Sequence, residues 1–579
     1  DWSSDVCSSD LYYSGGVFMA YFLKQTKLNG RTYLSIVDSF YSHQKKGTSH
    51  KVYKSLASIE TWEKNGLEDP VAHFQKEVDQ LNAQRQMEKT SEISDRSPKR
   101  YLGYFFARSI MDKLQIRKEV DYFKLVTDFD FDLYEVMASL IFSRLVNPCS
   151  KYKTYTEVIP YLFEEKSFSY DQLLTCVRFL GSNYEKFVEM FAHHVNRTYS
   201  LDTRTTYFDC TNFYFEIDKE DVLRRKGPSK ENRKDPIVSL GLLLDRNMIP
   251  AGMKIFPGNQ SEKPVLRQVV DDLKRQNNIS GKTVHVADKG LNSAKNIYES
   301  ISKGDGYLFS RSVKQLPETE KVWILLENDY KNVTDKDGRL LYRYKSCIDE
   351  FPYSFTDENG IVHKFTLKEK RVITYNPSLA KKKKMEIDRM ADKAAALTLS
   401  AAKRSEYGES GRYVDFKGRD NEKAKPVLNQ KKIDEDRKLA GYNLLVTSET
   451  KMSEQEIYAT YHNLWRIEES FKIMKSDLDA RPVYMKTEET IKGHFLICYL
   501  AVLIERILQF VILENRFSSE AIFCFFKNFI VVKGENRYIN ISTSSDLIRH
   551  MKDITGLPLT NYELSETQEI GRASCRERV

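Results

Sequence analysis

Zinc-binding and disulfide patterns are missing from this sequence of 579 residues. It has 8 cysteines and 10 histidines, no two cysteines form a C-x-x-C pair, and no histidines have zinc-ligand spacing. Scattered cysteines are typical of a protein in a reducing cytoplasm. The sequence therefore favours neither a zinc finger nor a disulfide scaffold.

A long uninterrupted apolar run is missing too. The most apolar stretch, Phe495–Leu513, contains Glu505 and Arg506, two charges that are costly in the centre of a bilayer. We predict a buried helix there and not a membrane span. No signal peptide precedes Met19.

The charge balance is basic but modest, with a formal net charge of +8. Such a balance permits a polyanionic partner without requiring one. The two ends, residues 1–11 and 569–579, resemble translated sequencing-adapter reads, and we exclude them as artefacts. We expect the native chain to begin at Met19.

The hydrophobic pattern changes along the chain and indicates successive regions. Residues 19–95 alternate apolar and polar positions and then turn helical, which predicts a small hairpin or meander followed by a charged helix. Residues 100–200 carry apolar positions at helical spacing, punctuated by Lys and Arg. This is typical of an ordinary helical bundle or of a DNA-binding region, and we favour the second.

Strand patterns dominate from residue 201 onward. Three strands followed by helix, strand, helix and strand over 201–310 predict the first part of a mixed α/β core. We predict a largely β insertion over 311–440, including a strand at Trp323–Leu326. The core resumes over 441–515, and 516–568 form a C-terminal region.

The stretch Tyr461–Lys475 predicts a helix in which the carboxylate of Glu468 occupies a position where the pattern calls for an apolar residue. No Gly or Pro interrupts it. Its predicted inward stripe is Ile457, Tyr461, Leu464, Glu468, Phe471, Met474 and Leu478. A buried carboxylate needs a cation or hydrogen-bond donors. The alternative is an exposed Glu468–Lys472 pair one turn apart.

Two aspartates of the predicted sheet lie where carboxylates are uncommon. Asp209 is in mid-strand, and alternation puts it on one face with Tyr207 and Thr211. Asp288 follows a strand, and ligands of α/β sheets collect at such strand ends. Each has a plainer explanation, a hydrogen-bonded core aspartate for Asp209 and a turn aspartate for Asp288.

In this order, Asp209, Asp288 and Glu468 resemble the catalytic carboxylates of the DDE transposases. The resemblance implies a ribonuclease-H-like mixed sheet, interrupted by a largely β insertion and preceded by a mainly helical region. The chain is also similar, more narrowly, to cut-and-paste transposases of bacterial insertion sequences.

That narrower family carries the pattern Y-x2-R-x3-E-x6-K on its glutamate helix. Tyr461, Glu468 and Lys475 match it at the right intervals. Leu464 stands where the family has Arg, and Arg466 is the nearest substitute.

The resemblance implies an enzyme that uses two Mg²⁺ ions, for which Mn²⁺ can substitute. Asp209 would bridge both ions, and Asp288 and Glu468 would each complete one site. Water would cut the DNA, and the freed 3′-OH would attack target DNA. Phosphate contacts, which position DNA without reading its sequence, are expected from Tyr461, Arg466, Lys472 and Lys475.

The implied partners are double-stranded DNA, as terminal inverted repeats and as target, and a second copy of the chain in a synaptic complex. No membrane is implied, and the implied place is the bacterial cytoplasm at the nucleoid. Two alternatives stay open: a catalytically silent DNA-binding protein derived from a transposon, and a ribonuclease-H-like nuclease that cuts without joining.

Two further interpretations remain open. Lys381–Lys384 is either a grip on DNA phosphates or a solvated face. Trp323 either stacks on a displaced base or packs in a core.

Overall fold

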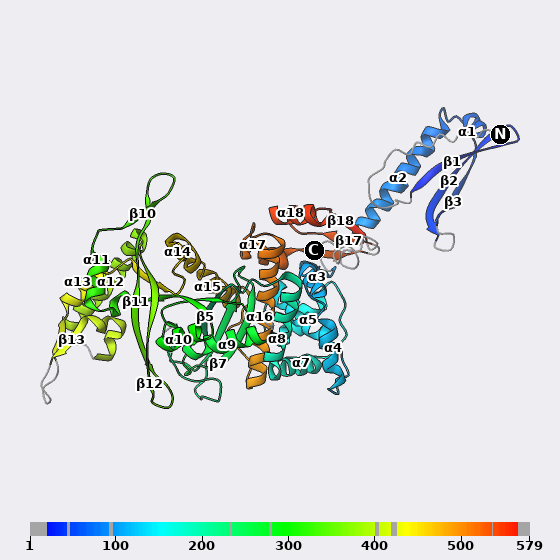
Figure 1. The fold of residues 1–579 in the computed structure, drawn as a ribbon. Coiled ribbons are helices and arrows are strands. Elements are labelled where there is room, and N and C mark those ends of the chain that lie inside the picture. The colour runs from blue at the N-terminus through cyan, green and yellow to red at the C-terminus, as the bar shows by residue number, and fades with distance from the viewer. Residues whose placement is uncertain are drawn as a thin grey trace. The chain divides into compact units, whose positions relative to one another are not determined.

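The structure is a computed structural model, and two compact units make up the part of the chain that it describes (Figure 1). The described residues are 20–42, 47–91, 97–230, 234–276, 281–399, 404–417, 425–534 and 537–565. Met19 and both adapter-like ends lie outside them. One unit takes its residues from Asp1–Gly103, Tyr161–Glu164 and Phe525–Arg578, and the other from Tyr104–Pro160 and Glu165–Cys524.

The smaller unit contains two antiparallel sheets. The first is the predicted meander, β1 (Tyr21–Leu28), β2 (Arg31–Ser42) and β3 (Gly47–Ser58), followed by α1 (Ile59–Lys64) and α2 (Pro70–Ser91). Arg85 of α2 pairs with Asp38 at 2.7 Å and lies over the Tyr21 ring, which holds the helix on the sheet. The second sheet contains β4 (Lys99–Tyr101), β16 (Ile530–Lys533), β17 (Arg537–Asn540) and β18 (Glu563–Ser565).

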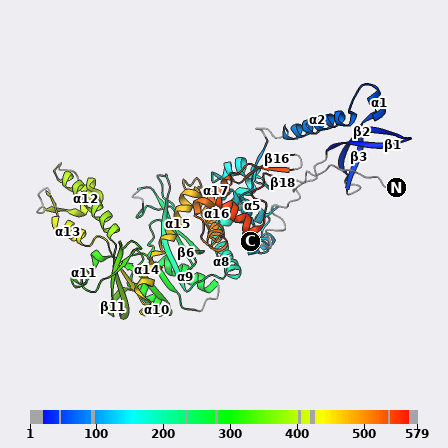
Figure 2. The ribbon, with the colours of Figure 1, turned by 90° about the horizontal axis from the view of Figure 1, so that it is seen from above.

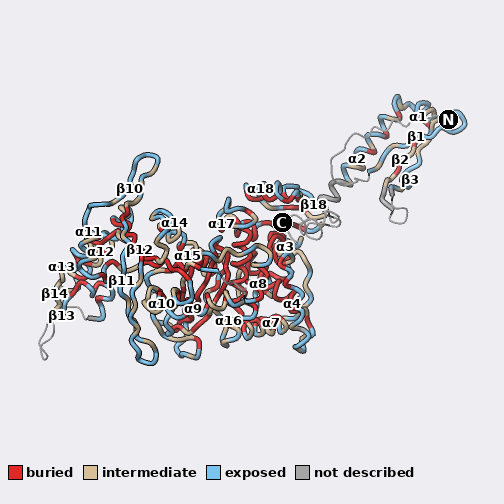
Figure 3. Tube along the Cα trace, viewed as in Figure 1, coloured by how far each residue is buried: buried red, intermediate tan, exposed pale blue. Residues whose placement is uncertain are grey.

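Helices fill the N-terminal part of the larger unit, as predicted. The longer ones are α3 (Phe105–Leu114), α4 (Arg117–Leu125), α5 (Leu133–Val146), α7 (Tyr170–Ser182) and α8 (Tyr184–Tyr199). Of these, α3, α5, α7 and α8 contact α16 (Glu488–Arg506), and buried residues concentrate around it (Figure 3). Gly181 and Gly493 allow α7 and α16 to touch, since a Cβ on Gly181 would lie 1.6 Å from the Glu489 carbonyl oxygen.

Helix α16 and the turn after it form the predicted apolar helix. Glu488–Ile512 is long and apolar enough to cross a membrane, but 83% of its most apolar window is buried against other parts of the protein. It is the core helix of the bundle. Within it, Arg506 is fully buried and pairs with Glu469 at 3.1 Å, so the charge that interrupts the run has a partner.

A nine-stranded mixed sheet forms the rest of the larger unit, which confirms the predicted mixed α/β class. Its order is β10-β11-β12-β15-β9-β8-β5-β6-β7, with parallel pairing only in β5–β8 and β8–β9. The strands are β5 (Thr205–Tyr214), β6 (Ile237–Leu244), β7 (Pro250–Pro257), β8 (Val284–Ala287), β9 (Gly306–Arg311), β10 (Lys331–Thr334), β11 (Leu340–Thr356), β12 (Val362–Tyr375) and β15 (Tyr442–Thr447).

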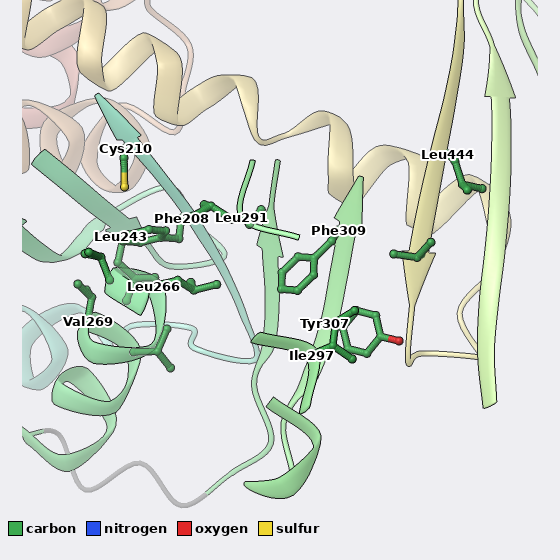
Figure 4. Close-up of a cluster of buried hydrophobic side chains, with 14 of the residues drawn as sticks. Phe208, Cys210, Leu243, Leu266, Val269, Leu291, Ile297, Tyr307, Phe309 and Leu444 are labelled. Atoms are coloured by element: carbon green, nitrogen blue, oxygen red, sulfur yellow. The ribbon is translucent and has the colours of Figure 1, made fainter. Parts of the chain in front are cut away.

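Helices cover both faces of the sheet at β5. On one face, Phe208 and Cys210 join an apolar cluster with residues of α9 (Lys263–Gln276) and α10 (Ala294–Ser302) (Figure 4). Side chains alternate along a strand, so Tyr207 and Asp209 point to the opposite face. There α14 (Glu454–His462) contacts β8 and β9, and α15 (Trp465–Lys472) contacts β5.

The segment between β9 and β15 is mixed and not largely β. Its strands β10–β12 extend the main sheet, while α12 (Pro377–Leu399) and α13 (Gln430–Lys438) lie side by side (Figures 1 and 2). The strand predicted at Trp323–Leu326 is wrong, because these residues end helix α11 (Glu318–Leu325). Acidic residues in its first turn favour the helix, and Ile324 supplies its buried contact.

A buried carboxylate fastens the long β11–β12 hairpin to the sheet. Glu369 of β12 is fully buried and accepts hydrogen bonds from the Tyr307 and Tyr353 hydroxyls, both at 2.6 Å. Arg371 donates to it at 2.7 Å. Tyr307 belongs to β9, so the contact joins the hairpin to a strand two places away in the sheet.

Replacing Glu369 with Ala should lower the free energy of unfolding by about 3 kcal/mol, because three donors lose their acceptor and Arg371 loses a buried partner. Urea unfolding followed by tryptophan fluorescence measures the loss. Glu350→Ala, at an exposed position of β11, is the matched control and should change stability by less than about 0.5 kcal/mol. Equal effects of the two substitutions would contradict a structural role for the Glu369 network.

Candidate active site

Asp209 and Asp288 lie at the same level on two adjacent strands. The parallel register pairs Tyr207 with Val286 and Phe208 with Ala287, so the two aspartates come next along β5 and β8. Strand β8 ends at Ala287, so Asp288 lies directly after the end of the strand. The sheet thus brings together two carboxylates that are far apart in the sequence.

Two hydroxyl groups orient the Asp288 carboxylate. Ser310 Oγ donates to Asp288 Oδ1 at 2.9 Å, and the Tyr461 hydroxyl donates to the same oxygen at 3.1 Å. Ser310 is a buried residue of β9, and Tyr461 belongs to α14. The carboxylate is therefore held by donors from a strand and from a helix that both follow it in the chain.

The Asp209 carboxylate lies close to a lysine that the sequence did not single out. Lys230 Nζ is 3.4 Å from Asp209 Oδ1, and the Cys210 amide donates to the same oxygen at 2.7 Å. Burial raises the pKa of Asp209 and Asp288 adds to the rise, while Lys230 opposes it. The net direction is upward, so the charged form is disfavoured despite the lysine.

The helix predicted over Tyr461–Lys475 is interrupted. Helix α14 ends at His462, α15 begins at Trp465, and a π-helical turn follows at Ile473–Asp477. The buried face keeps its predicted phase through the interruption, since Ile457, Leu464, Phe471, Met474 and Leu478 are buried as predicted. Ile467 is fully buried and Glu468 is exposed, so the prediction that Glu468 occupies the buried stripe is wrong.

Glu468 nevertheless interacts electrostatically with the two aspartates, and its helix α15 contacts β5. Desolvation, followed by the like charges of Asp209 and Asp288, raises the pKa of Glu468. Lys230 again acts in the opposite direction. Three acidic side chains from β5, from the residue after β8 and from α15 thus converge on one face of the sheet.

The chemistry of this cluster fits a hard divalent cation. Within the described ranges, no group of three His, Cys, Asp or Glu side chains already has the geometry of a metal site. The residues themselves are carboxylates, the ligand type that Mg²⁺ prefers. Burial, with like-charge repulsion added to it, raises the pKa values of Asp209 and Glu468, and a bound cation would offset both effects.

Of the residues predicted to bind DNA, Tyr461 reaches the carboxylate cluster. Its hydroxyl is the donor to Asp288, a contact that the sequence pattern did not indicate. Lys475 is half-buried, and its ammonium lies 5.4 Å from the centre of the Phe213 ring.

The other two predicted DNA-binding residues belong to α15. Arg466 pairs with Glu469 at 3.2 Å and lies 3.9 Å from the centre of the Trp465 ring, and Lys472 is exposed. Leu464, in the place of the family's arginine, is only 9% exposed and packs in the core. Arg466 is thus held by Glu469, in a contact that involves none of the three carboxylates.

Of the two remaining sequence interpretations, the contacts of the structure bear on that of Trp323. Trp323 is half-buried against the main apolar cluster, with Lys345 Nζ 5.1 Å from its ring centre. Lys381–Lys384 is exposed along the first turns of α12, and Lys383 pairs with Glu386 at 2.7 Å. Trp323 packs as its plainer interpretation expects, whereas the exposure of Lys381–Lys384 fits a solvated face and a grip on DNA phosphates equally.

Glu468→Gln should slightly stabilise the metal-free protein, by about 0.5 kcal/mol or less, because water screens an exposed carboxylate. The folded-state pKa is raised above the ordinary 4.5, so the destabilisation by Glu468 is present at neutral pH and disappears below pH 4.5. Unfolding midpoints in chelator at pH 7 and pH 4 measure both effects.

Glu469, the neighbouring residue, provides a control for which the opposite change in stability is expected. Glu469 pairs with Arg466 and with the fully buried Arg506, so Glu469→Gln should destabilise the protein at pH 7 by about 1–2 kcal/mol. A loss of stability in both variants would argue against repulsion at Glu468.

Comparison with known proteins gives one family match. Residues 217–504 match the family model described as the transposase DDE domain. The matched segment includes Asp288 and Glu468 and begins after Asp209. A search of curated proteins gives no match.

The chain is also similar to a solved structure, the cryo-EM structure of the piggyBac transposase synaptic complex with hairpin DNA. The identity is 10%, the match covers 75% of this chain and 81% of that chain, and the TM-score is 0.36. The family match over residues 217–504 supports a DDE-type transposase.

Proposed function

We propose that this chain is a DNA transposase that binds terminal inverted repeats, cleaves DNA and joins the 3′-OH ends to target DNA. Asp209, Asp288 and Glu468 are its proposed catalytic, metal-binding residues, on a ribonuclease-H-like core. The observation that carries the proposal is the convergence of these three carboxylates despite their repulsion. Clustered acids with raised pKa values are typical of functional sites.

The proposed reaction is an in-line displacement at phosphorus. When bound, two Mg²⁺ ions supply activation of the attacking oxygen and stabilisation of the leaving oxygen. Asp209, Asp288 and Glu468 would hold the ions, and Asp209 lies beside Asp288 and influences the pKa of Glu468. Ser310 and Tyr461 hold Asp288 in a fixed orientation, and no Ser or Tyr nucleophile is required.

The DNA contacts of the proposed enzyme follow from cations near the glutamate. Lys472 is exposed one turn after Glu468, and Lys475 follows in the π-helical turn. Phosphate contacts by these lysines, with Arg466 and Tyr461, would position the transposon end without reading its sequence. The proposed assembly is a homodimer that synapses two ends, at the bacterial nucleoid.

Under this proposal Asp209→Asn, Asp288→Asn and Glu468→Gln should each lower DNA cleavage by at least about a thousandfold, because each removes a charged ligand from one catalytic unit. Binding of DNA ends should persist. The assay uses labelled DNA carrying the repeats that flank the gene, with Mg²⁺ for cleavage and Ca²⁺ for binding. Asp337→Asn, at an exposed hairpin turn, is the control and should cut like the wild type.

The same assay distinguishes the proposed transposase from a nuclease and from a silent DNA-binding protein. Retained Mg²⁺-dependent cutting by any of the three variants would remove that residue from the site. Cutting without strand transfer by the wild type would identify a nuclease. End binding with no cutting by the wild type would identify a silent DNA-binding protein.

A further inference from the structure

The proposed metal site already contains a cation that belongs to the chain. Lys230 lies between β5 and β6, and its ammonium is 3.4 Å from Asp209 Oδ1. The same Nζ donates to the Cys210 carbonyl oxygen, and the Lys230 amide donates to Asn212 Oδ1 at 3.2 Å. Backbone and side chain of Lys230 are thus both attached to β5.

The Lys230 ammonium lies among several carboxylates. The positive charge of Lys230 favours the ionised forms of Asp209, Glu468 and Glu262, and so opposes the rise in their pKa values. Across the described residues, no other Lys or Arg forms an ion pair with Asp209, Asp288 or Glu468. One lysine therefore supplies a compensating positive charge to Asp209 and Glu468.

Glu262 is a fourth acid beside this cluster. It is half-buried and directly precedes α9. Burial raises the pKa of Glu262, and the charge of Asp209 adds to the rise. Lys230 thus interacts electrostatically with Asp209 of the proposed triad and with an acid outside it.

We propose that Lys230 is a tethered counter-ion that neutralises the metal-free site and leaves Asp209 when a divalent cation binds. The inference rests on the proposed function, because it takes Asp209 as a metal ligand. A Mg²⁺ ion contacts its ligand oxygens at about 2.0–2.1 Å. At that distance from Asp209 Oδ1 it would strongly repel an ammonium held by the same oxygen.

Two consequences follow for the chain. The flexible stem of lysine allows the ammonium to move away without unfolding the strand. A cation must bind strongly enough to displace the lysine, so Lys230 lowers the apparent metal affinity and favours divalent over monovalent ions.

Calorimetric titration of the DNA-free full chain with Mn²⁺ tests the inference. Lys230→Met should bind Mn²⁺ at least about tenfold more tightly than the wild type, because a competing positive charge is removed. Lys226→Met changes an exposed lysine of the same segment and should leave the affinity unchanged. Asp209→Asn should abolish binding.

The outcomes distinguish this inference from the proposed function. Equal affinity of the wild type and Lys230→Met, or weaker binding by the variant, would overturn the role of Lys230 and leave the metal site standing. Absence of Mn²⁺ binding in every variant and the wild type would overturn the metal site and the inference together. Circular dichroism checks folding, and Lys230→Gln replaces Lys230→Met if that variant does not fold.

Discussion

Repulsion among Asp209, Asp288 and Glu468 is the constraint that the surrounding structure has to overcome. Burial and then the like charges of Asp209 and Asp288 raise the pKa of Glu468, so the ionised Glu468 slightly destabilises the folded protein at neutral pH. Parallel pairing of β5 with β8 places Asp209 within a strand and Asp288 directly after the neighbouring strand, in a sheet covered on both faces. Lys230 offsets part of the repulsion, and a divalent cation would remove more of it.

The long segment between β9 and β15 also helps to position the carboxylates. Asp288 and Glu468 are separated by the hairpin β11–β12 and by α12, yet β12 pairs with β15 and β15 pairs with β9. Strand β15 leads into α14, which carries Tyr461 back to Asp288. The Glu369 network fastens the hairpin to β9, so the insertion also supports the strand that supplies Ser310.

Much of the core could be predicted from local pattern, and the rest depended on contacts between distant residues. Alternation and apolar runs predicted the strands of the mixed sheet and the buried α16. The interruption at Asn463–Leu464 could not be predicted, because no Gly or Pro marks it and the pattern also suits one continuous helix. Lys230 and Glu262 carry no motif, and only the fold brings them to Asp209.

Diffraction from DNA-free crystals grown with saturating Mn²⁺ tests the central claim most directly. The claim predicts an anomalous peak about 2.0–2.3 Å from carboxylate oxygens of Asp209 and of Asp288 or Glu468, with the Lys230 ammonium displaced from Asp209. A metal bound elsewhere, or no peak at this cluster with Lys230 still paired to Asp209, would contradict it.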